Sequence, residues 1–197
     1  RSSDLYLRQI LPDESGDAAL EADRIIGVFR QPTFIDKQIK MFVAVKSGAA
    51  YQLYTYTYEQ KTSGSDIITC VGKKDITSWA GGMSDDCKMF TNGVEVPLNY
   101  LYIAKGNDLW RTSYESQADP KAVKSFPAPI TAAEVVISTP NTISENTKEL
   151  YTAIFTYDTS AKTSKMYVLD ARTDDLKAYS EVETAIPGKV VRYLANQ

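Results

Sequence analysis

The fold of this chain is decided by residues 149–183, which read Glu149-Leu-Tyr-Thr-Ala-Ile-Phe-Thr-Tyr157, a polar turn, Lys165-Met-Tyr-Val-Leu-Asp-Ala-Arg172, the short turn Thr173-Asp-Asp175, and Leu176-Lys-Ala-Tyr-Ser-Glu-Val-Glu183. Apolar and aromatic residues alternate with polar ones in each run, as in half-buried strands. The turns between the runs are short enough for hairpins. The stretch therefore predicts three consecutive antiparallel strands.

Two other places repeat the central hairpin of this meander. The first runs from Met41-Phe-Val-Ala-Val-Lys46 through Ser47-Gly-Ala49 to Tyr51-Gln-Leu-Tyr-Thr-Tyr-Thr-Tyr58. The second runs from Asn99-Tyr-Leu-Tyr-Ile-Ala-Lys105 through Gly106-Asn-Asp108 to Leu109-Trp-Arg-Thr-Ser-Tyr-Glu115. Gly, Asn and Asp tolerate the positive φ of tight hairpin turns, so both repeats are predicted hairpins.

Aligning the three hairpins predicts a repeat architecture. Phe42, Tyr102 and Tyr167 fall in register, at spacings near about 60 residues, close to one four-stranded propeller blade. A strand rich in Ile or Val precedes each hairpin, at 24–30, 66–72 and 132–138. We predict an all-β fold of antiparallel meander repeats, a partial β-propeller of about three blades. A β-sandwich is the alternative. The predicted units of this single module, residues 1–197, are 24–62, 66–126 and 132–183.

Two hairpins carry a resemblance to known proteins: Tyr100-Leu-Tyr-Ile-Ala-Lys-Gly-Asn-Asp-Leu-Trp-Arg111 and Met166-Tyr-Val-Leu-Asp-Ala-Arg-Thr-Asp-Asp-Leu-Lys-Ala-Tyr179. They resemble blade hairpins of β-propellers in secreted and periplasmic bacterial proteins. The blade pattern is also similar to the propeller-like C-terminal region of PKD-like lipoproteins encoded beside outer-membrane glycan-uptake systems. The resemblance implies an extracytoplasmic location, in the periplasm, on the outer membrane or secreted. It also implies binding or assembly, with a glycan or another surface protein as partner.

The number of repeats bears on the extent of the chain. Three blades cannot close a ring, because propellers use at least about four. An open array exposes sheet edges through which it could associate. We therefore expect a fragment of a longer protein, an expectation that Arg1 in place of Met favours.

Composition excludes several function classes. A net charge of -3 and a pI near 5.1 argue against a nucleic-acid partner, which requires a basic surface. The absence of His removes His-based triads and His metal sites. No run approaches the roughly 18 apolar residues of a membrane-spanning segment. With no catalytic, nucleotide or metal motif, we expect no cofactor, no metal and no enzymatic activity. The alternative is part of a glycoside hydrolase, which would bring two carboxylates together.

The candidate binding residues are aromatic or acidic. Trp79 and Trp110 are flat rings of the kind that stack on sugars, although packing between strands is the alternative for both. Tyr54, Tyr56 and Tyr58 share one face of a strand, as a binding platform or as core. The acidic pairs Asp85–Asp86 and Asp174–Asp175 could bind a ligand or simply shape turns. Residues 73–98, the least regular region, are the expected contact loop.

The two cysteines, Cys70 and Cys87, are a disulfide candidate. A bridge between them would stabilise the fold by roughly 3 kcal/mol in an oxidising compartment. Two buried thiols are the alternative.

Overall fold

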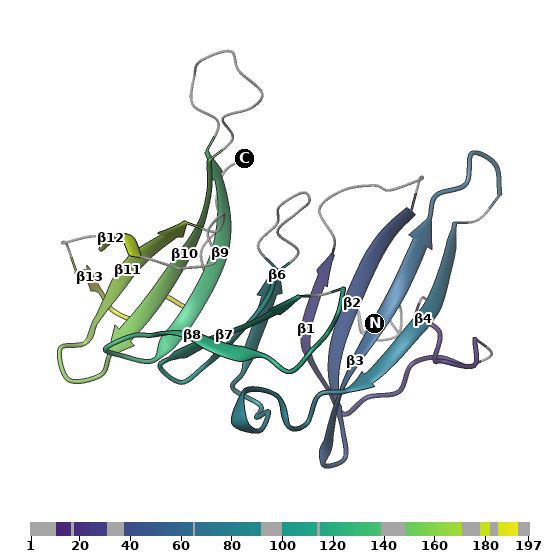
Figure 1. Ribbon diagram of the computed structural model, residues 1–197, viewed down its shortest axis with the longest axis horizontal. Helices are drawn as coiled ribbons and strands as arrows, with labels where there is room; N and C mark the ends of the chain where they lie inside the picture. The colour runs from purple at the N-terminus through teal and green to yellow at the C-terminus, as the bar shows by residue number, and fades with distance from the viewer. Residues whose placement is uncertain are drawn as a thin grey trace. The chain divides into compact units, whose positions relative to one another are not determined.

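The computed structural model describes residues 11–16, 18–30, 38–64, 66–91, 100–113, 115–138, 149–170, 178–181 and 185–192. These residues form three antiparallel meander sheets, each built from strands that follow one another along the chain (Figure 1). The predicted all-β class and the meander repeat are confirmed. The chain divides into two compact units, residues 1–85 and 86–197.

The first unit contains one sheet with strands in chain order: β1 (Arg24–Arg30), β2 (Gln38–Ser47), β3 (Ala50–Glu59) and β4 (Ile67–Asp75). The hairpin β2–β3 is the first predicted repeat, and Gly48 turns it with a φ of 59°. Alternation along β2 and β3 gives the sheet two buried faces. One face carries Val43, Val45 and Tyr56 against Leu11, and residues such as Phe42 and Leu53 are buried on the other.

The second unit contains the other two sheets. One has the order β5 (Lys88–Thr91), β6 (Tyr100–Lys105), β7 (Asp108–Ser113), β8 (Lys121–Ser125). The other has β9 (Ile130–Ser138), β10 (Glu149–Asp158), β11 (Thr163–Asp170) and β12 (Ala178–Glu181), with β13 (Ile186–Pro187) pairing β11. The predicted meander at 149–183 is thus confirmed as β10, β11 and β12.

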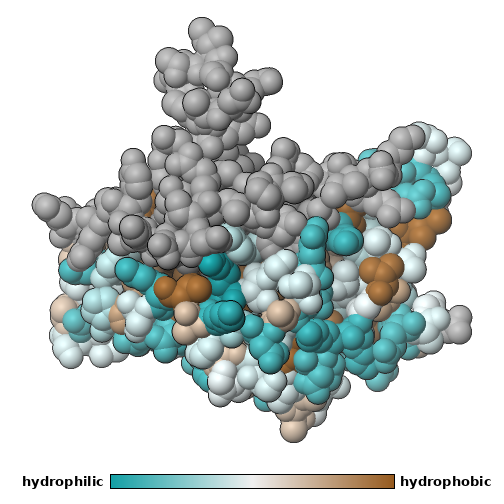
Figure 2. Space-filling model, viewed as in Figure 1, coloured by the Kyte–Doolittle hydropathy of each residue, from teal (hydrophilic) through white to brown (hydrophobic). Residues whose placement is uncertain are grey.

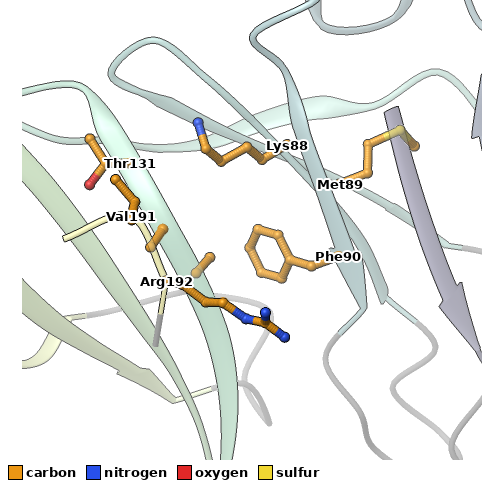
Figure 3. Close-up of a pocket in the computed structure, with 8 residues that line it drawn as sticks. Lys88, Met89, Phe90, Thr131, Val191 and Arg192 are labelled. Carbon is orange, nitrogen blue, oxygen red and sulfur yellow. The ribbon is translucent and has the colours of Figure 1, made fainter. Parts of the chain in front are cut away.

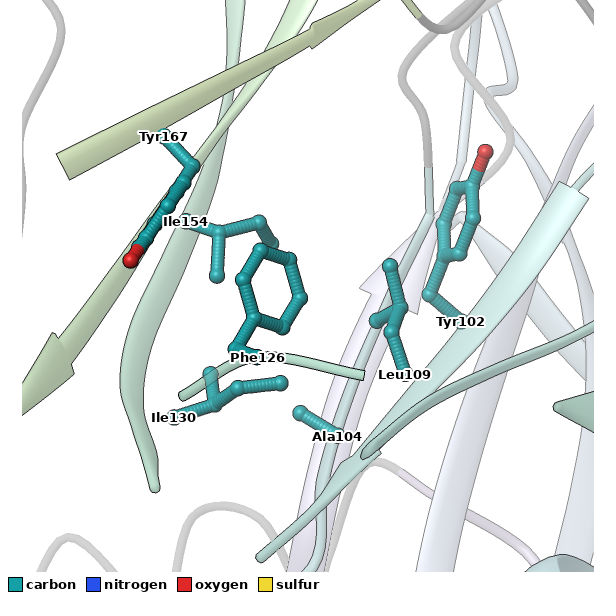
Figure 4. Packing of buried hydrophobic residues seen from close by; sticks show 7 residues of the cluster. All are labelled: Tyr102, Ala104, Leu109, Phe126, Ile130, Ile154 and Tyr167. Atoms are coloured by element: carbon teal, nitrogen blue, oxygen red, sulfur yellow. The ribbon is translucent and has the colours of Figure 1, made fainter. Parts of the chain in front are cut away.

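The core of the second unit joins its two sheets (Figure 4). Its buried side chains come from β6 and β7 on one side and from β9, β10 and β11 on the other: Tyr102, Ala104, Leu109, Ile130, Ile154 and Tyr167. Phe126 lies among them, with its ring centroid 5.0 Å from that of Tyr167. These apolar residues hold the two sheets of the unit together by burial.

The strand order separates the propeller-like fold from the sandwich alternative. Every sheet follows chain order, so its strands are joined as hairpins and not by the Greek-key connections of an immunoglobulin-type sandwich. The fold is a partial propeller-like array of meander sheets.

The predicted unit boundaries and alignment need two corrections. The strand predicted at 66–72 as the start of the second unit is β4, which pairs with β3 as the last strand of the first sheet. Phe42 and Tyr102 lie in second strands, whereas Tyr167 lies in the third strand of its sheet. Both errors have one cause: alternation identifies a strand but does not say which neighbour it pairs with.

Two smaller segments follow the first and third sheets. After β4, Asp75 accepts a hydrogen bond from the Thr77 N–H at 2.8 Å, and Trp79–Gly81 forms a 3₁₀ helix, η1. Near the C-terminus, residues 189–192 form no strand. Residues 185–192, which we call the C-terminal strap, lie against the third sheet through β13 and through side-chain hydrogen bonds.

Candidate functional site

The second unit contains a pocket of about 140 Å³ between β5, β9 and the C-terminal strap (Figure 3). β5 and β9 are the first strands of their sheets, and they lie close together. The residues that line the pocket are Lys88, Met89, Phe90, Thr131, Ala132, Ala133, Val191 and Arg192. Each of the two strands and the strap therefore supplies part of the wall.

Phe90 is the aromatic wall of the pocket. It lies opposite Tyr102 in the β5–β6 ladder, and the two rings stack with centroids 5.2 Å apart and an interplanar angle of 19°. Tyr102 is itself fully buried in the core. Cross-strand ring pairs of this kind stabilise a sheet and fix the orientation of both rings. Phe90, which is only half-buried, thus presents a fixed apolar surface to the pocket.

The strap is attached to the third sheet by two buried hydroxyl groups. Ser164 in β11 donates to the Gly188 carbonyl at 2.7 Å and accepts from the Val190 N–H at 3.0 Å. Thr131 in β9 donates to the Val190 carbonyl at 2.6 Å. These bonds satisfy both backbone groups of Val190, whose side chain packs near Phe155. They position the next two residues, Val191 and Arg192, at the pocket.

The pocket has two cationic side chains in its lining, Lys88 and Arg192. Figure 3 shows the Lys88 amine and the Arg192 guanidinium on different sides of the Phe90 ring. Among the described residues, the lining contains no carboxylate and neither cation has an ion pair. The arrangement combines an apolar ring with positive charge, in a space open to solvent at the exposed residues Val191 and Arg192.

The first unit has a cluster of the opposite kind around Asp85. The Tyr51 hydroxyl donates to Asp85 Oδ1 at 2.6 Å, and the Lys46 amine lies 3.0 and 3.2 Å from the two carboxylate oxygens. Arg24 adds a contact at 3.4 Å. The Tyr51 hydrogen bond, followed by the Lys46 interaction, lowers the pKa of Asp85 below its usual value. The cluster joins the segment after η1 to β1, β2 and β3, and both of its cations contact the one carboxylate.

The tryptophans lie within the packing of the sheets. Trp79 is 1% exposed, with the Lys74 amine 5.8 Å from its ring centroid, so its face is not presented at the surface for stacking on a ligand. Its indole Nε1 is buried and has no hydrogen-bond partner among the described residues. Trp110 is half-buried in β7, between Ile103 on β6 and Ala122 on β8. The surface-stacking interpretation of Trp79 is corrected accordingly.

The tyrosine row is packed, as its alternative interpretation allowed. Tyr54 and Tyr56 are buried and stacked at 6.3 Å, and the Tyr56 hydroxyl donates to the Pro12 carbonyl at 2.9 Å. Burial raises the pKa of Tyr56 well above its usual range. Tyr58 donates to Asp66 at 2.6 Å. Because Leu11 and Leu20 pack against this face, it is not an open platform.

The remaining candidates do not form a site. Cys70 and Cys87 are thiols that form no disulfide; Cys70 packs in β4, and Cys87 is buried before β5. Asp86 is exposed next to the Asp85 cluster, and Asp174–Asp175 lie outside the described residues. No group of three or more acidic or cysteine ligands for a metal occurs among the described residues. No described helix is long and apolar enough to cross a membrane.

Sequence reasoning found part of the pocket. Lys88 and Phe90 lie within 73–98, the loop expected to carry contacts, although they are on a strand. Arg192 and Thr131 were missed, because the hydroxyl bonds that fix the strap join residues 59 and 26 positions apart. A weak signal was present in the Pro187-Gly188 turn, which interrupts the apolar run and allows the strap to leave β13.

Comparison with known proteins gives structural likeness only. No protein-family model and no curated protein matches the sequence. Among solved structures, the chain is similar to a chimera of apocarotenoid oxygenase and RPE65, with a TM-score of 0.45, 15% identity, and coverage of 88% of this chain and 40% of that one. A cobalt-substituted apocarotenoid oxygenase from Synechocystis gives a TM-score of 0.42, 15% identity, and coverage of 87% and 38%.

These matches correct one expectation. The chain spans about two fifths of the length of the matched structures, which are oxygenases by name. The prediction that the chain is not an enzyme is contradicted by this comparison, and we do not maintain it. The likeness concerns the fold alone, so no substrate, metal or residue role is carried over to this chain.

Proposed function

We propose that the chain is a carbohydrate-binding module and that the pocket between β5, β9 and the strap takes one sugar residue of a glycan. The observation that carries this proposal is the Phe90 ring, held by stacking on Tyr102 and turned towards a pocket of ring size. A cavity of about 150 Å³ can accommodate a molecule the size of benzene, and this pocket has about 140 Å³. It therefore fits one six-membered ring.

The chemistry of the wall supports a sugar over a wholly apolar ligand. The C–H face of a pyranose packs on an aromatic ring, while its hydroxyls need polar partners. Phe90 supplies the ring, and Lys88 and Arg192 supply donors. One sugar on a pocket this small should bind weakly, with a Kd of about 1 mM, and several modules would gain strength through avidity.

The test is a titration of the 197-residue chain with mono- and oligosaccharides, followed by calorimetry or by NMR shifts of residues at the pocket. Phe90→Leu keeps an apolar side chain but removes the flat ring, and we expect binding to fall by about tenfold. Phe90→Tyr keeps the ring and should retain binding. Equal affinity of Phe90→Leu and the parent chain, or no binding of any sugar, would contradict the proposal.

The glycoside hydrolase alternative has no support at this pocket, because its lining lacks a carboxylate pair. Location is a separate proposal. We propose that the protein works outside the cytoplasm, as a secreted or surface-attached bacterial lipoprotein, which is supported by the resemblance of its hairpins to those of such proteins. Protease treatment of intact and lysed cells is the test, and protection in intact cells together with full recovery in the cytoplasmic fraction would count against it.

A second proposal, assembly, has one observation in its favour. β4 is an edge strand of the first sheet, and Ile67 and Val71 on it are 46% and 54% exposed. Edge strands with apolar side chains pair readily with other strands. In Figure 2 the described surface is mostly polar, with apolar residues in small separate patches. If β4 pairs with another copy, sedimentation should show a dimer that Val71→Lys dissociates; a monomer at high concentration would exclude this route.

A further inference from the structure

Four basic side chains form ion pairs within the described residues, and the two cations of the pocket do not. Arg24, Lys46, Lys61 and Lys73 each contact a carboxylate within 3.4 Å. Lys88 and Arg192 line one small pocket without such a partner in the described residues. Two positive charges beside one cavity favour a ligand that carries a negative charge. The missing partner is therefore negative.

We infer that the sugar bound here is acidic, a hexuronic acid whose ring lies on Phe90 and whose carboxylate pairs with Arg192, while Lys88 adds positive charge on another side of the pocket. This inference rests on the proposed function and specifies its ligand class. A hexuronate carries its carboxylate on the same ring that stacks, so one small ligand satisfies the aromatic wall and the charges together. Arginine suits this role, because its guanidinium can bind a carboxylate through two parallel hydrogen bonds.

The size and open side of the pocket indicate how many sugar units of a glycan contact the protein. The pocket holds one ring, while Val191, 72% exposed, and the exposed Arg192 form its open side. The remainder of a chain would extend into solvent from that side. Recognition then depends on a single acidic sugar unit of the glycan. The protein's net charge of -3 gives no long-range attraction for a polyanion, so selection for the acid is local.

The strap makes the charge arrangement dependent on the fold of the third sheet. Arg192 lies two residues after Val190, whose backbone carbonyl and N–H are bound by Thr131 and Ser164. Lys88 is fixed independently, in the β5–β6 ladder opposite Ala104. Two separately anchored cations thus line the pocket that holds the ring of Phe90. Such preorganisation lowers the entropic cost of binding.

The experiment compares glucuronate with three probes on the intact chain: glucose, glucuronate methyl ester and acetate. We expect glucuronate to bind about tenfold more tightly than the ester, because its carboxylate makes charge-assisted hydrogen bonds. The difference should disappear in Arg192→Gln and shrink in Lys88→Gln. Both residues lie at the surface or partly exposed, and a control variant, Lys124→Gln on β8, should keep the parent preference.

The outcomes separate this inference from the proposed function. If glucose, the ester and glucuronate bind equally, the pocket binds sugar but the acidic-sugar inference is wrong. If acetate binds as tightly as glucuronate, the ring contributes nothing and both are wrong. If none binds, the proposed function fails. A preference for glucuronate that persists unchanged in the double variant Lys88→Gln/Arg192→Gln would overturn the assignment of these two residues.

Discussion

The Asp85 cluster of the first unit and the pocket of the second unit use similar groups in opposite states. Each combines an aromatic ring with two basic side chains: Tyr51 with Arg24 and Lys46 in the first, Phe90 with Lys88 and Arg192 in the second. In the first unit a carboxylate of the same chain lies between the cations. In the second, the lining supplies none.

Because of this difference, the Asp85 cluster stabilises the fold, whereas the pocket can bind a ligand. Asp85 is bound by a hydroxyl and two cations, and a ligand would have to displace those contacts before it could bind. The pocket cations face space of about 140 Å³, so a ligand carboxylate replaces water only. A residue count alone would rank Asp85 with its basic neighbours as the better site. The pocket is the better candidate, because its cations have no carboxylate partner among the described lining residues.

The largest effect is expected where the pocket depends on the strap. Ser164→Ala removes the hydroxyl that bonds both Gly188 and Val190, and leaves the Gly188 carbonyl and the Val190 N–H without that partner. We expect a loss of about 2 kcal/mol in the free energy of unfolding, measured in urea, and a loss of sugar binding because Arg192 is no longer positioned. Ser160→Ala, in the exposed β10–β11 turn, is the control and should change neither quantity. Full binding by Ser164→Ala would show that the strap does not build the pocket.

The next largest effect is expected when the pocket is given a carboxylate of its own, as in the Asp85 cluster. Val191→Glu places a carboxylate on the strap beside Arg192, at a side chain that is 72% exposed and so tolerates the change. The internal carboxylate should pair with the pocket cations and lower glucuronate affinity by about tenfold with little change in thermal midpoint. Val191→Gln has the same shape without the charge, and it should bind nearly as the parent does. If both variants bind equally, the cations do not select an anion.

The sequence predicted the strands well and the site poorly, for physical reasons. Alternation at 149–157 and 51–58 indicates strands, because successive side chains of a strand point to opposite faces, and this is a local property of the chain. The pocket requires Phe90, Thr131 and Arg192 to converge from three elements, and this depends on pairing partners that alternation does not specify. Trp79 was singled out because of its residue type, yet it is 1% exposed. Whether a carboxylate pairs with Lys88 depends on what lies near it in space, which no local pattern shows.

A smaller effect is expected in the pH dependence of the first unit. The hydrogen bonds from Tyr51 and Lys46 lower the pKa of Asp85 below 3.8, so its ionised form stabilises the folded state. That contribution is fully present above pH 4 or so, and it is lost as the pH falls through the lowered pKa. Asp85→Asn should therefore melt a few degrees below the parent at pH 7, with the difference shrinking in acid. Glu21→Gln, at an exposed side chain of the same unit, is the control; a gap that stays constant with pH would contradict the assignment.

The smallest effect should come from Arg24, and it gives the sharpest contrast between the two regions. Arg24 is the outer cation of the Asp85 cluster, 55% exposed and 3.4 Å from the carboxylate, and Lys46 and Tyr51 remain bound when it is removed. Exposed ion pairs contribute little, so Arg24→Gln should shift the thermal midpoint by about 1 °C or less. Arg192→Gln should leave the midpoint equally unchanged but remove the preference for the acidic sugar. Both variants should thus leave stability almost unchanged, but only Arg192→Gln should alter sugar binding, because Arg24 is already paired with Asp85 whereas Arg192 is available to a ligand. A midpoint shift of several degrees in Arg192→Gln would instead show that Arg192 stabilises the fold.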